Sequence, residues 1–166
     1  MDRRPALGID YSLSMCALAR ARGMVAYQAN AVALPFADAQ FDIIYSAEML
    51  QFIDDLPALF AEFARVCRPG GRIVVSTPNA ASLLRRGLKV ARRFRPHAVW
   101  AAYRPVALRT AEELAIAARG LPLKLNLACW IHSPFPWRRC RASARNRLEW
   151  MATNAVVRFV KQPSAS

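Results

Sequence analysis

Apolar and polar residues come in blocks along the first half of the chain, and these blocks predict strands and helices in turn. Short apolar runs with the length of strands occupy residues 6–10, 24–28, 41–46 and 72–77. Before the last run, apolar side chains recur at helical spacing, at Leu56, Leu59, Phe60, Phe63, Val66 and Cys67. The runs at 41–46 and 72–77 are apolar-rich rather than cleanly alternating, which is typical of parallel strands covered on both faces. This order predicts an α/β fold with a doubly wound, mostly parallel sheet.

Capping and turn residues indicate where these elements begin and end. Ser12 can cap a first helix, and Gly23 can end it in a left-handed turn. Asp54 or Asp55 is expected to cap the helix that begins near Leu56. The sequence Arg-Pro-Gly-Gly at residues 68–71 is expected to stop that helix with a tight turn.

The second half of the chain is less regular. Thr110 and Glu113 have the spacing of a capping box, which predicts a helix that begins there and ends near Gly120. The other expected elements are helices at 80–94 and 138–151, and strands at 123–129 and 155–161. Because there is no repeat and no linker-like segment, residues 1–166 are expected to form a single domain.

Composition narrows the class of protein. No uninterrupted apolar stretch reaches the roughly 18 residues that span a membrane, and the start lacks the apolar core of a signal peptide, so a cytoplasmic protein is expected. The cysteines, Cys16, Cys67, Cys129 and Cys140, form no close pair, and no histidine stands at ligand spacing from them. We therefore expect no metal site, and reduced cysteines that act as small apolar residues.

Charge is divided unevenly along the chain. Residues 1–62 hold four basic and eight acidic residues, a net of −4, whereas residues 63–166 hold twenty basic and three acidic, a net of +17. Arginine outnumbers lysine by 21 to 3, so one interpretation is the codon bias of a GC-rich genome. The other is a basic face for an anionic substrate, an anionic membrane surface or RNA. On a helix over 80–94, four basic side chains would lie on neighbouring faces, namely Arg85, Lys89, Arg92 and Arg93.

Four stretches, in this order and spacing, carry a family resemblance: GIDYSLSMCALARARG, ANAVALPFADAQFDIIYS, ALFAEFARVCRPGGRIVVSTPN and LRTAEELAIAARG. The chain resembles the class I S-adenosylmethionine-dependent methyltransferases, most closely the methyltransferase type 11 family. The resemblance is good over residues 6–79, fair over 106–120 and poor elsewhere. It implies a Rossmann-like fold, S-adenosyl-L-methionine as the cofactor, and methyl transfer to a small-molecule or lipid-linked acceptor. Residues 1–79 would then be part of a cofactor-binding half, and residues 80–166 a basic, substrate-side half.

The resemblance implies contacts to the nucleoside part of the cofactor. Asp10 ends its strand, where an acidic side chain can accept hydrogen bonds from both ribose hydroxyls; the alternative role is a helix cap. Tyr11 would lie against the adenine ring. The pair Asn30-Ala31 stands where the family has Asp-Ala, and an Asn carbonyl can still accept the adenine amino group, but without charge. The alternative for Asn30 is an ordinary turn residue.

The resemblance also places residues at the methionine end of the cofactor. Ser46 resembles the position that touches this part, and residues 47–51 should line the pocket mouth. No catalytic residue is assigned. His97 and His132 could act as general bases, but we interpret them as ordinary surface or core histidines. Because methyl transfer from a sulfonium depends mainly on alignment and a dry site, the enzyme does not require a strong base.

One departure from the family concerns its glycine-rich loop. None of the six glycines forms a G-x-G after a strand near the start, so we expect the first strand and its loop to be missing, roughly 20–30 residues by average element lengths. In the family this strand lies between those at 6–10 and 41–46. Without it, either backbone groups stay unpaired or the two strands are forced together. We therefore expect this chain to bind S-adenosylmethionine far more weakly than complete relatives.

Three functions follow from these patterns. The first is a methyltransferase by descent, for which the sequence leaves open whether this truncated chain is active. The second is a non-catalytic, methyltransferase-like protein that completes a sheet or complex with another chain. The third is an RNA methyltransferase or RNA-binding module that uses the basic half, although no recognised RNA-binding motif is present and few aromatic residues interrupt the arginine runs.

Overall fold

The computed structural model describes residues 6–80, 82, 108–131 and 154–163. In chain order its elements are β1 (Leu7–Asp10), α1 (Leu13–Ala21), β2 (Val25–Gln28), β3 (Phe41–Ala47), the 3-10 turn η1 (Leu50–Phe52), α2 (Leu56–Val66), β4 (Cys67–Pro78), α5 (Ala111–Ala117), β5 (Leu123–Ile131) and β6 (Asn154–Lys161). The helices expected at 80–94 and 138–151, and with them His97, His132, Cys140 and the basic faces, lie outside the described residues.

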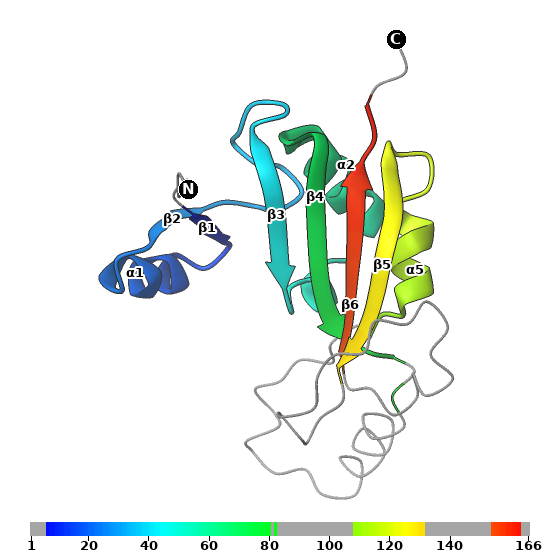
Figure 1. Ribbon diagram of the computed structural model, residues 1–166. Helices are drawn as coiled ribbons and strands as arrows, with labels where there is room; N and C mark the ends of the chain where they lie inside the picture. Colours follow the sequence, from blue (N-terminus) through cyan, green and yellow to red (C-terminus); the bar gives the residue numbers. More distant parts are fainter. Residues whose placement is uncertain (1–5, 81, 83–107, 132–153, 164–166) are drawn as a thin grey trace, which may run out of the picture.

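The strands form two separate sheets (Figure 1). Strands β1 and β2 pair in parallel and carry α1; we call these three elements the N-terminal unit. The other four strands have the order β3-β4-β6-β5, and we call this the main sheet. Among the described residues, no ladder joins β1 to β3.

The expected α/β class is confirmed, and the direction of the strands is mixed. Pairs β1–β2 and β3–β4 are parallel, whereas β6 runs antiparallel to both β4 and β5. Helices α2 and α5 lie together behind the main sheet in Figure 1. On the opposite side, Ile43 and Tyr45 of β3 alternate with the inward-facing Ile44 and are exposed, by 60% and 69%.

The core lies between the main sheet and its two helices. Its fully buried members include Leu59 and Phe60 of α2, Leu114 of α5 and Phe159 of β6. Phe60 meets Phe159 edge to face, with ring centroids 5.2 Å apart. Of the expected helical positions, Leu56, Leu59, Phe60, Phe63 and Val66 are all buried in α2, which confirms the periodicity from which the helix was predicted.

Local capping follows the sequence closely. The Ser12 hydroxyl accepts a hydrogen bond from the Met15 N–H, and Gly23 after α1 has the left-handed φ of +80°. Asp55, rather than Asp54, caps α2 by accepting from the Ala58 N–H at 2.9 Å. Thr110 and Glu113 form the expected capping box at α5.

Helix α2 ends before the segment Arg-Pro-Gly-Gly, as predicted, but the segment lies within a strand. Strand β4 begins directly after α2, at Cys67, so residues 68–71 belong to the strand and Cys67 does not belong to the helix. The pairing with β3 is irregular there, with a register shift between Phe41 and Ile43. Gly71 has no room for a side chain, because a Cβ would lie 2.6 Å from the Cys67 sulfur. Between Cys67 and Arg72, β4 has four residues where β3 has one, and Gly70 has a left-handed φ of +74°, so the chain turns here within the bounds of β4.

No helix within the described part of the chain combines the length and the apolarity needed to cross a membrane.

Candidate cofactor site

Asp10 lies where the sequence predicted it, as the last residue of β1. It is exposed, and its Oδ1 accepts a hydrogen bond from the Ser12 N–H at 2.8 Å. This bond holds the carboxylate at the turn into α1 and leaves acceptor capacity free, since an ionised carboxylate has about four lone-pair sites. Ser12 is the helix cap, so the alternative role of Asp10 as the cap is excluded. Tyr11 is 77% exposed beside it, and its ring is open to a ligand.

Asn30 and Ala31 follow β2 in a loop that leads to β3. The Asn30 side chain accepts a hydrogen bond from the Val32 N–H at 3.2 Å, and its carbonyl accepts from the Ala33 N–H at 3.0 Å. Asn30 is exposed, whereas Ala31 is partly buried against the core. Asn30 is thus a turn-forming residue, and its amide N–H groups remain available to a ligand.

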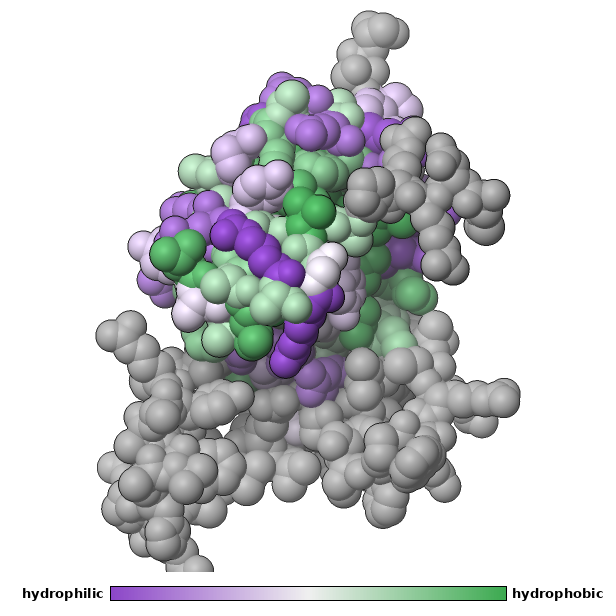
Figure 2. All heavy atoms as spheres, turned by 90° about the vertical axis from the view of Figure 1, so that its left-hand side faces the viewer, coloured by the Kyte–Doolittle hydropathy of each residue, from purple (hydrophilic) through white to green (hydrophobic). Residues whose placement is uncertain are grey.

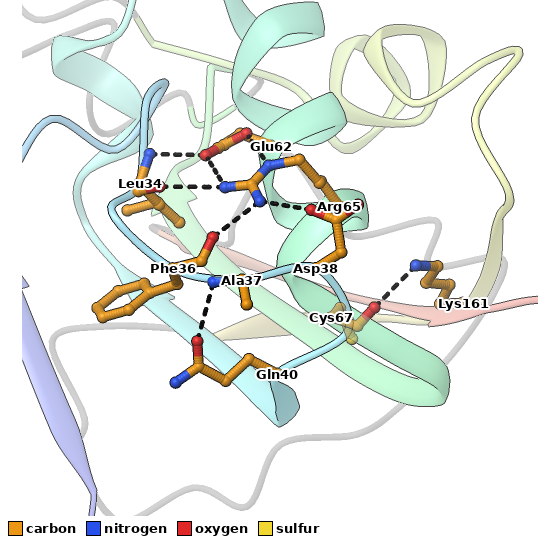
Figure 3. Close-up of polar contacts among 9 residues, drawn as sticks. All are labelled: Leu34, Phe36, Ala37, Asp38, Gln40, Glu62, Arg65, Cys67 and Lys161. Carbon is orange, nitrogen blue, oxygen red and sulfur yellow. Dashed lines mark hydrogen bonds and ion pairs between the residues drawn. The ribbon is translucent and has the colours of Figure 1, made fainter.

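The rest of this loop is clamped to α2 by two charged side chains (Figure 3). Glu62 accepts a hydrogen bond from the Leu34 N–H at 2.6 Å and is bridged to Arg65. Arg65 donates to the carbonyls of Leu34 and Phe36, at 3.0 and 2.8 Å, and forms an ion pair with Asp38 at 2.6 Å. The end of the loop that leads from Asn30 and Ala31 to β3 is therefore held against α2. These contacts of Glu62 and Arg65 were not predicted from the sequence.

These contacts shift the acid–base behaviour of both partners. The hydrogen bond from Arg65 lowers the pKa of Glu62, against the opposing effect of burial. The bonds to Glu62 and Asp38 raise the pKa of Arg65. At neutral pH both groups are charged, so the clamp combines ion pairs with charge-assisted hydrogen bonds.

Ser46 lies near the carboxyl end of β3 and is buried, with 6% exposure. Its hydroxyl finds no hydrogen-bond partner among the described residues, and neither does that of Thr77 in β4. Ser46 pairs with Val75, so Thr77 lies two residues further along on the same side of the sheet. A buried hydroxyl without a protein partner is available to a ligand or to water. Thr77 was not among the predicted residues.

Glu48 lies within residues 47–51, the range predicted to line the pocket mouth, although the sequence assigned it no role of its own. It follows β3 with a left-handed φ of +53°, a strained conformation for a residue with a side chain. Its N–H donates to the Ser76 carbonyl at 3.0 Å, and its Oε1 accepts from the Asn154 side chain at 2.7 Å. Residues of β4 and β6 thus hold the Glu48 carboxylate at the carboxyl end of β3. Leu50, by contrast, is fully buried in the core, so residues 47–51 do not all line a pocket mouth as expected.

The structure thus brings Asp10 to the end of β1, Asn30 to the turn after β2 and Ser46 to the end of β3. The carboxyl ends of parallel strands are where ligands bind in open α/β sheets. The sequence also predicts that Asp10, Asn30 and Ser46 open onto one crevice, and this stays a prediction.

A family model, described as a methyltransferase domain, matches residues 3–75. A relative, the demethylmenaquinone methyltransferase of Mycolicibacterium paratuberculosis, is 43% identical over 75 residues, which are 43% of this chain and 33% of the relative. The chain spans between a quarter and a third of the length of the curated relatives it matches. The match falls almost entirely within the part of the chain, residues 6–79, that carries the resemblance seen in the sequence.

Solved structures share the fold. A SAM-dependent methyltransferase from Thermotoga maritima superposes with a TM-score of 0.77 at 20% identity, covering 94% of this chain and 72% of that one. A geranyl diphosphate methyltransferase in complex with SAM superposes with a TM-score of 0.62 at 16% identity, covering 95% and 67%. The first superposition leaves out 6% of this chain, which is fewer residues than the segment Leu7–Gln28 contains. The match therefore includes residues of both sheets.

Proposed function

We propose that this protein, whose residues 3–75 match the model of a methyltransferase domain, binds S-adenosylmethionine and serves methyl transfer. The family match over residues 3–75 carries the proposal. It is supported by the position of Asp10 at the carboxyl end of β1 and by the SAM bound in one structure of the same fold.

The cofactor-binding residues in this proposal are Asp10, Tyr11, Asn30, Ala31 and Ser46. Asp10 binds the ribose hydroxyls, since its carboxylate has free acceptor sites beyond the bond to Ser12. Tyr11 covers one face of the adenine, and Asn30 with Ala31 faces its edge. Ser46 offers its buried hydroxyl to the methionine end. The bound cofactor would supply an electrophilic methyl group, and the role of these residues is to orient it and exclude water.

The proposed acceptor is a small molecule or a lipid-linked molecule. The names of two matched proteins, a demethylmenaquinone and a geranyl diphosphate methyltransferase, support this class. Incubation with methyl-labelled cofactor and one acceptor of each kind tests it, since label must move to the acceptor in at least one case.

Isothermal titration with S-adenosylmethionine tests the cofactor site directly. Asp10→Asn keeps the carbonyl that accepts from Ser12 but removes the charge, and should weaken binding by about ten- to a hundredfold. Asp54→Asn, at an exposed aspartate next to the α2 cap, is the matched control and should leave binding unchanged. Equal affinity of the Asp10→Asn variant would remove Asp10 from the site.

A second candidate is a non-catalytic protein that completes a sheet or complex with another chain, and the division of the strands into two sheets favours it. The same titration separates the two candidates. No heat at millimolar cofactor would support this second function over methyl transfer.

A further inference from the structure

Glu48 is held in place through its backbone and its side chain together. Its N–H donates to the Ser76 carbonyl at 3.0 Å, and its own carbonyl accepts from the Gln51 side chain at 2.8 Å. Its Oε1 accepts from the Asn154 side chain at 2.7 Å and from the Ser76 hydroxyl at 3.4 Å. The carboxylate therefore has a fixed position just beyond the end of β3.

The backbone of Glu48 is also strained. Within the part of the chain that the structure describes, two residues other than glycine have a positive φ, Glu48 at +53° and Ala39 at +56°. Ala39 lies in an exposed loop, whereas Glu48 is half-buried directly after a strand. A left-handed conformation costs free energy in a residue with a side chain, and such residues cluster at ligand sites, where the surrounding contacts maintain them. The contacts of Glu48 maintain a conformation that glycine would adopt more readily.

The Glu48 carboxylate extends away from the cofactor residues proposed in the N-terminal unit. That unit lies beside β3 in Figure 1, on the side opposite β4. Glu48 reaches in the other direction, past β4 to Asn154 of β6. Ser46, proposed for the methionine end of the cofactor, precedes Glu48 by two residues on the same strand end. The position of Glu48 thus suits the molecule that receives the methyl group rather than the nucleoside that Asp10 would bind.

The chemistry of this carboxylate limits the groups that it can bind. An ionised carboxylate has about four lone-pair sites, and the contacts with Asn154 and Ser76 use two of them. It accepts hydrogen bonds and donates none, so its ligand must carry an N–H or O–H group. Because Asn154 and Ser76 already fix the side chain, binding costs little further side-chain entropy.

The surface of the N-terminal unit has no comparable selectivity. Seen from the side of this unit, apolar side chains stand among polar ones (Figure 2). The exposed apolar residues include Leu13, Met24 and Tyr27. Apolar side chains that are scattered in this way are ordinary on a protein surface. Glu48 differs from them, because a carboxylate held by two neighbours recognises a ligand by its hydrogen-bond donors.

We propose that the Glu48 carboxylate binds the methyl acceptor, and that this acceptor carries a hydroxyl or amino group that donates a hydrogen bond to it. Asn154 and Ser76 are positioning residues, because they hold the carboxylate. This inference rests on the proposed function, since an acceptor is needed only if a methyl group is transferred. It adds the chemical class of the acceptor and the residue that selects it.

Two pairs of fluorescent molecules are the probes, namely naphthol with its methyl ether, and naphthylamine with its dimethyl derivative. The second member of each pair lacks the donor. In fluorescence titrations without cofactor, the donor-bearing member of at least one pair should bind at least about tenfold more tightly than its counterpart, since a hydrogen bond to a charged group is gained. A preference in the first pair indicates a hydroxyl acceptor, and one in the second pair indicates an amino acceptor.

Variants of the chain assign the preference to Glu48. Glu48→Gln keeps an oxygen for Asn154 but removes the charge, and should abolish the preference for the donor-bearing probes. Glu112→Gln makes the same change at an exposed glutamate of α5 and should retain it. Circular dichroism establishes that both variants fold.

A second pair of variants decides the matter if Glu48→Gln does not fold. Glu48→Asn suits the left-handed backbone, which Asn adopts more readily than Glu, but carries no carboxylate. It should abolish the preference, whereas Ala39→Asn, at the other positive φ, should retain it. If Glu48 served only to join the strands, its variants would lower the melting temperature and leave the preference unchanged.

Several results would overturn the proposal. Equal binding within both pairs, or binding of none of the four probes, would show that the chain selects no hydrogen-bond donor. A preference that survives in the Glu48 variants, or is lost equally in Glu112→Gln, would remove Glu48 from the site. Isothermal titration of the unaltered chain with S-adenosylmethionine is scored separately. A preference without cofactor binding would support Glu48 as a donor-binding group and refute methyl transfer, whereas cofactor binding without a preference would refute the role of Glu48 alone.

Discussion

The N-terminal unit and the main sheet are both built from parallel strands joined by a helix, yet they differ in what they bury. In the N-terminal unit only Cys16 and Ala26 are buried. In the main sheet, β3–α2–β4 adds a core that includes Leu59, Phe60 and Ile73, all fully buried. The same local pattern of strand, helix and strand thus gives a well-packed layer only where further strands and α5 close over it.

The difference shows that correct local structure and stability are separate properties. The N-terminal unit has its helix cap, its left-handed glycine and its parallel ladder. What it lacks is apolar area removed from water, which is the main source of folding free energy. Its stability must therefore come from the few contacts, such as that of Ile9, that reach the main core.

The largest expected effect is a core deletion in the main sheet. Phe60→Ala removes a fully buried ring that packs on Phe63 and Phe159, and should lower the free energy of unfolding by about 3–5 kcal/mol. Met15→Ala, at a 51% exposed position of α1, should change it by less than about 0.5 kcal/mol. Urea denaturation measures both, and equal losses would contradict the division between the two regions.

The next largest effect is expected in the rates of amide hydrogen exchange of the two regions. Amides of β1 and β2 should exchange about a hundredfold faster than those of β4 and β6, because few buried contacts oppose local opening of the N-terminal unit. Exchange in both regions at the rate of global unfolding would mean that they open as one cooperative unit.

The room for a Cβ atom at two glycines, one in each region, also distinguishes the main sheet from the N-terminal unit. Gly71→Ala places a Cβ 2.6 Å from the Cys67 sulfur and 2.8 Å from the Arg68 carbonyl, and should cost about 1–3 kcal/mol. Gly8→Ala in β1 meets nothing closer than 3.6 Å and should be neutral or stabilise by about 0.4–1 kcal/mol. Thermal unfolding of the two variants tests this, and a destabilised Gly8→Ala would mean that β1 is packed more tightly than its exposure indicates.

The smallest effect concerns the clamp between α2 and the loop before β3. Arg65 lowers the pKa of Glu62 in the folded chain, so the stabilisation is present above the ordinary pKa of 4.5 and is lost as the pH falls through the lower folded value. Glu62→Gln should cost about 1 kcal/mol at neutral pH and little in acid. Denaturation midpoints at the two pH values measure it. A cost independent of pH would assign the effect to packing.

Most local structure could be predicted because it depends on residues close in sequence. The caps at Ser12, Asp55 and Thr110 each join atoms three residues apart, and the helical periodicity of α2 lies within one element. The turn at residues 68–71 could be predicted, but its inclusion in β4 could not, because the pairing of Cys67 with Phe41 joins residues far apart in the sequence.

The parts of the site that could not be predicted depend on distant residues. Glu48 and Asn154 are 106 positions apart, and no pattern in either segment signals their contact. Arg65 reaches Leu34 across 31 positions. Asp10, by comparison, could be placed from its strand alone, because a strand end followed by a capped helix is a local feature.

The position of β6 has a consequence for the order in which the protein folds. Residues 154–161 form an inner strand that pairs with β4 on one side and β5 on the other. The main sheet therefore cannot close until residues 154–161 have been synthesised, because β6 pairs with β4, which lies far from it in the sequence. The strands of the N-terminal unit pair only with neighbours in sequence, but the contact of Ile9 with the main core can form only after that core, so the apolar surface of the unit stays uncovered until then. A chaperone that holds apolar segments would find its earliest target there.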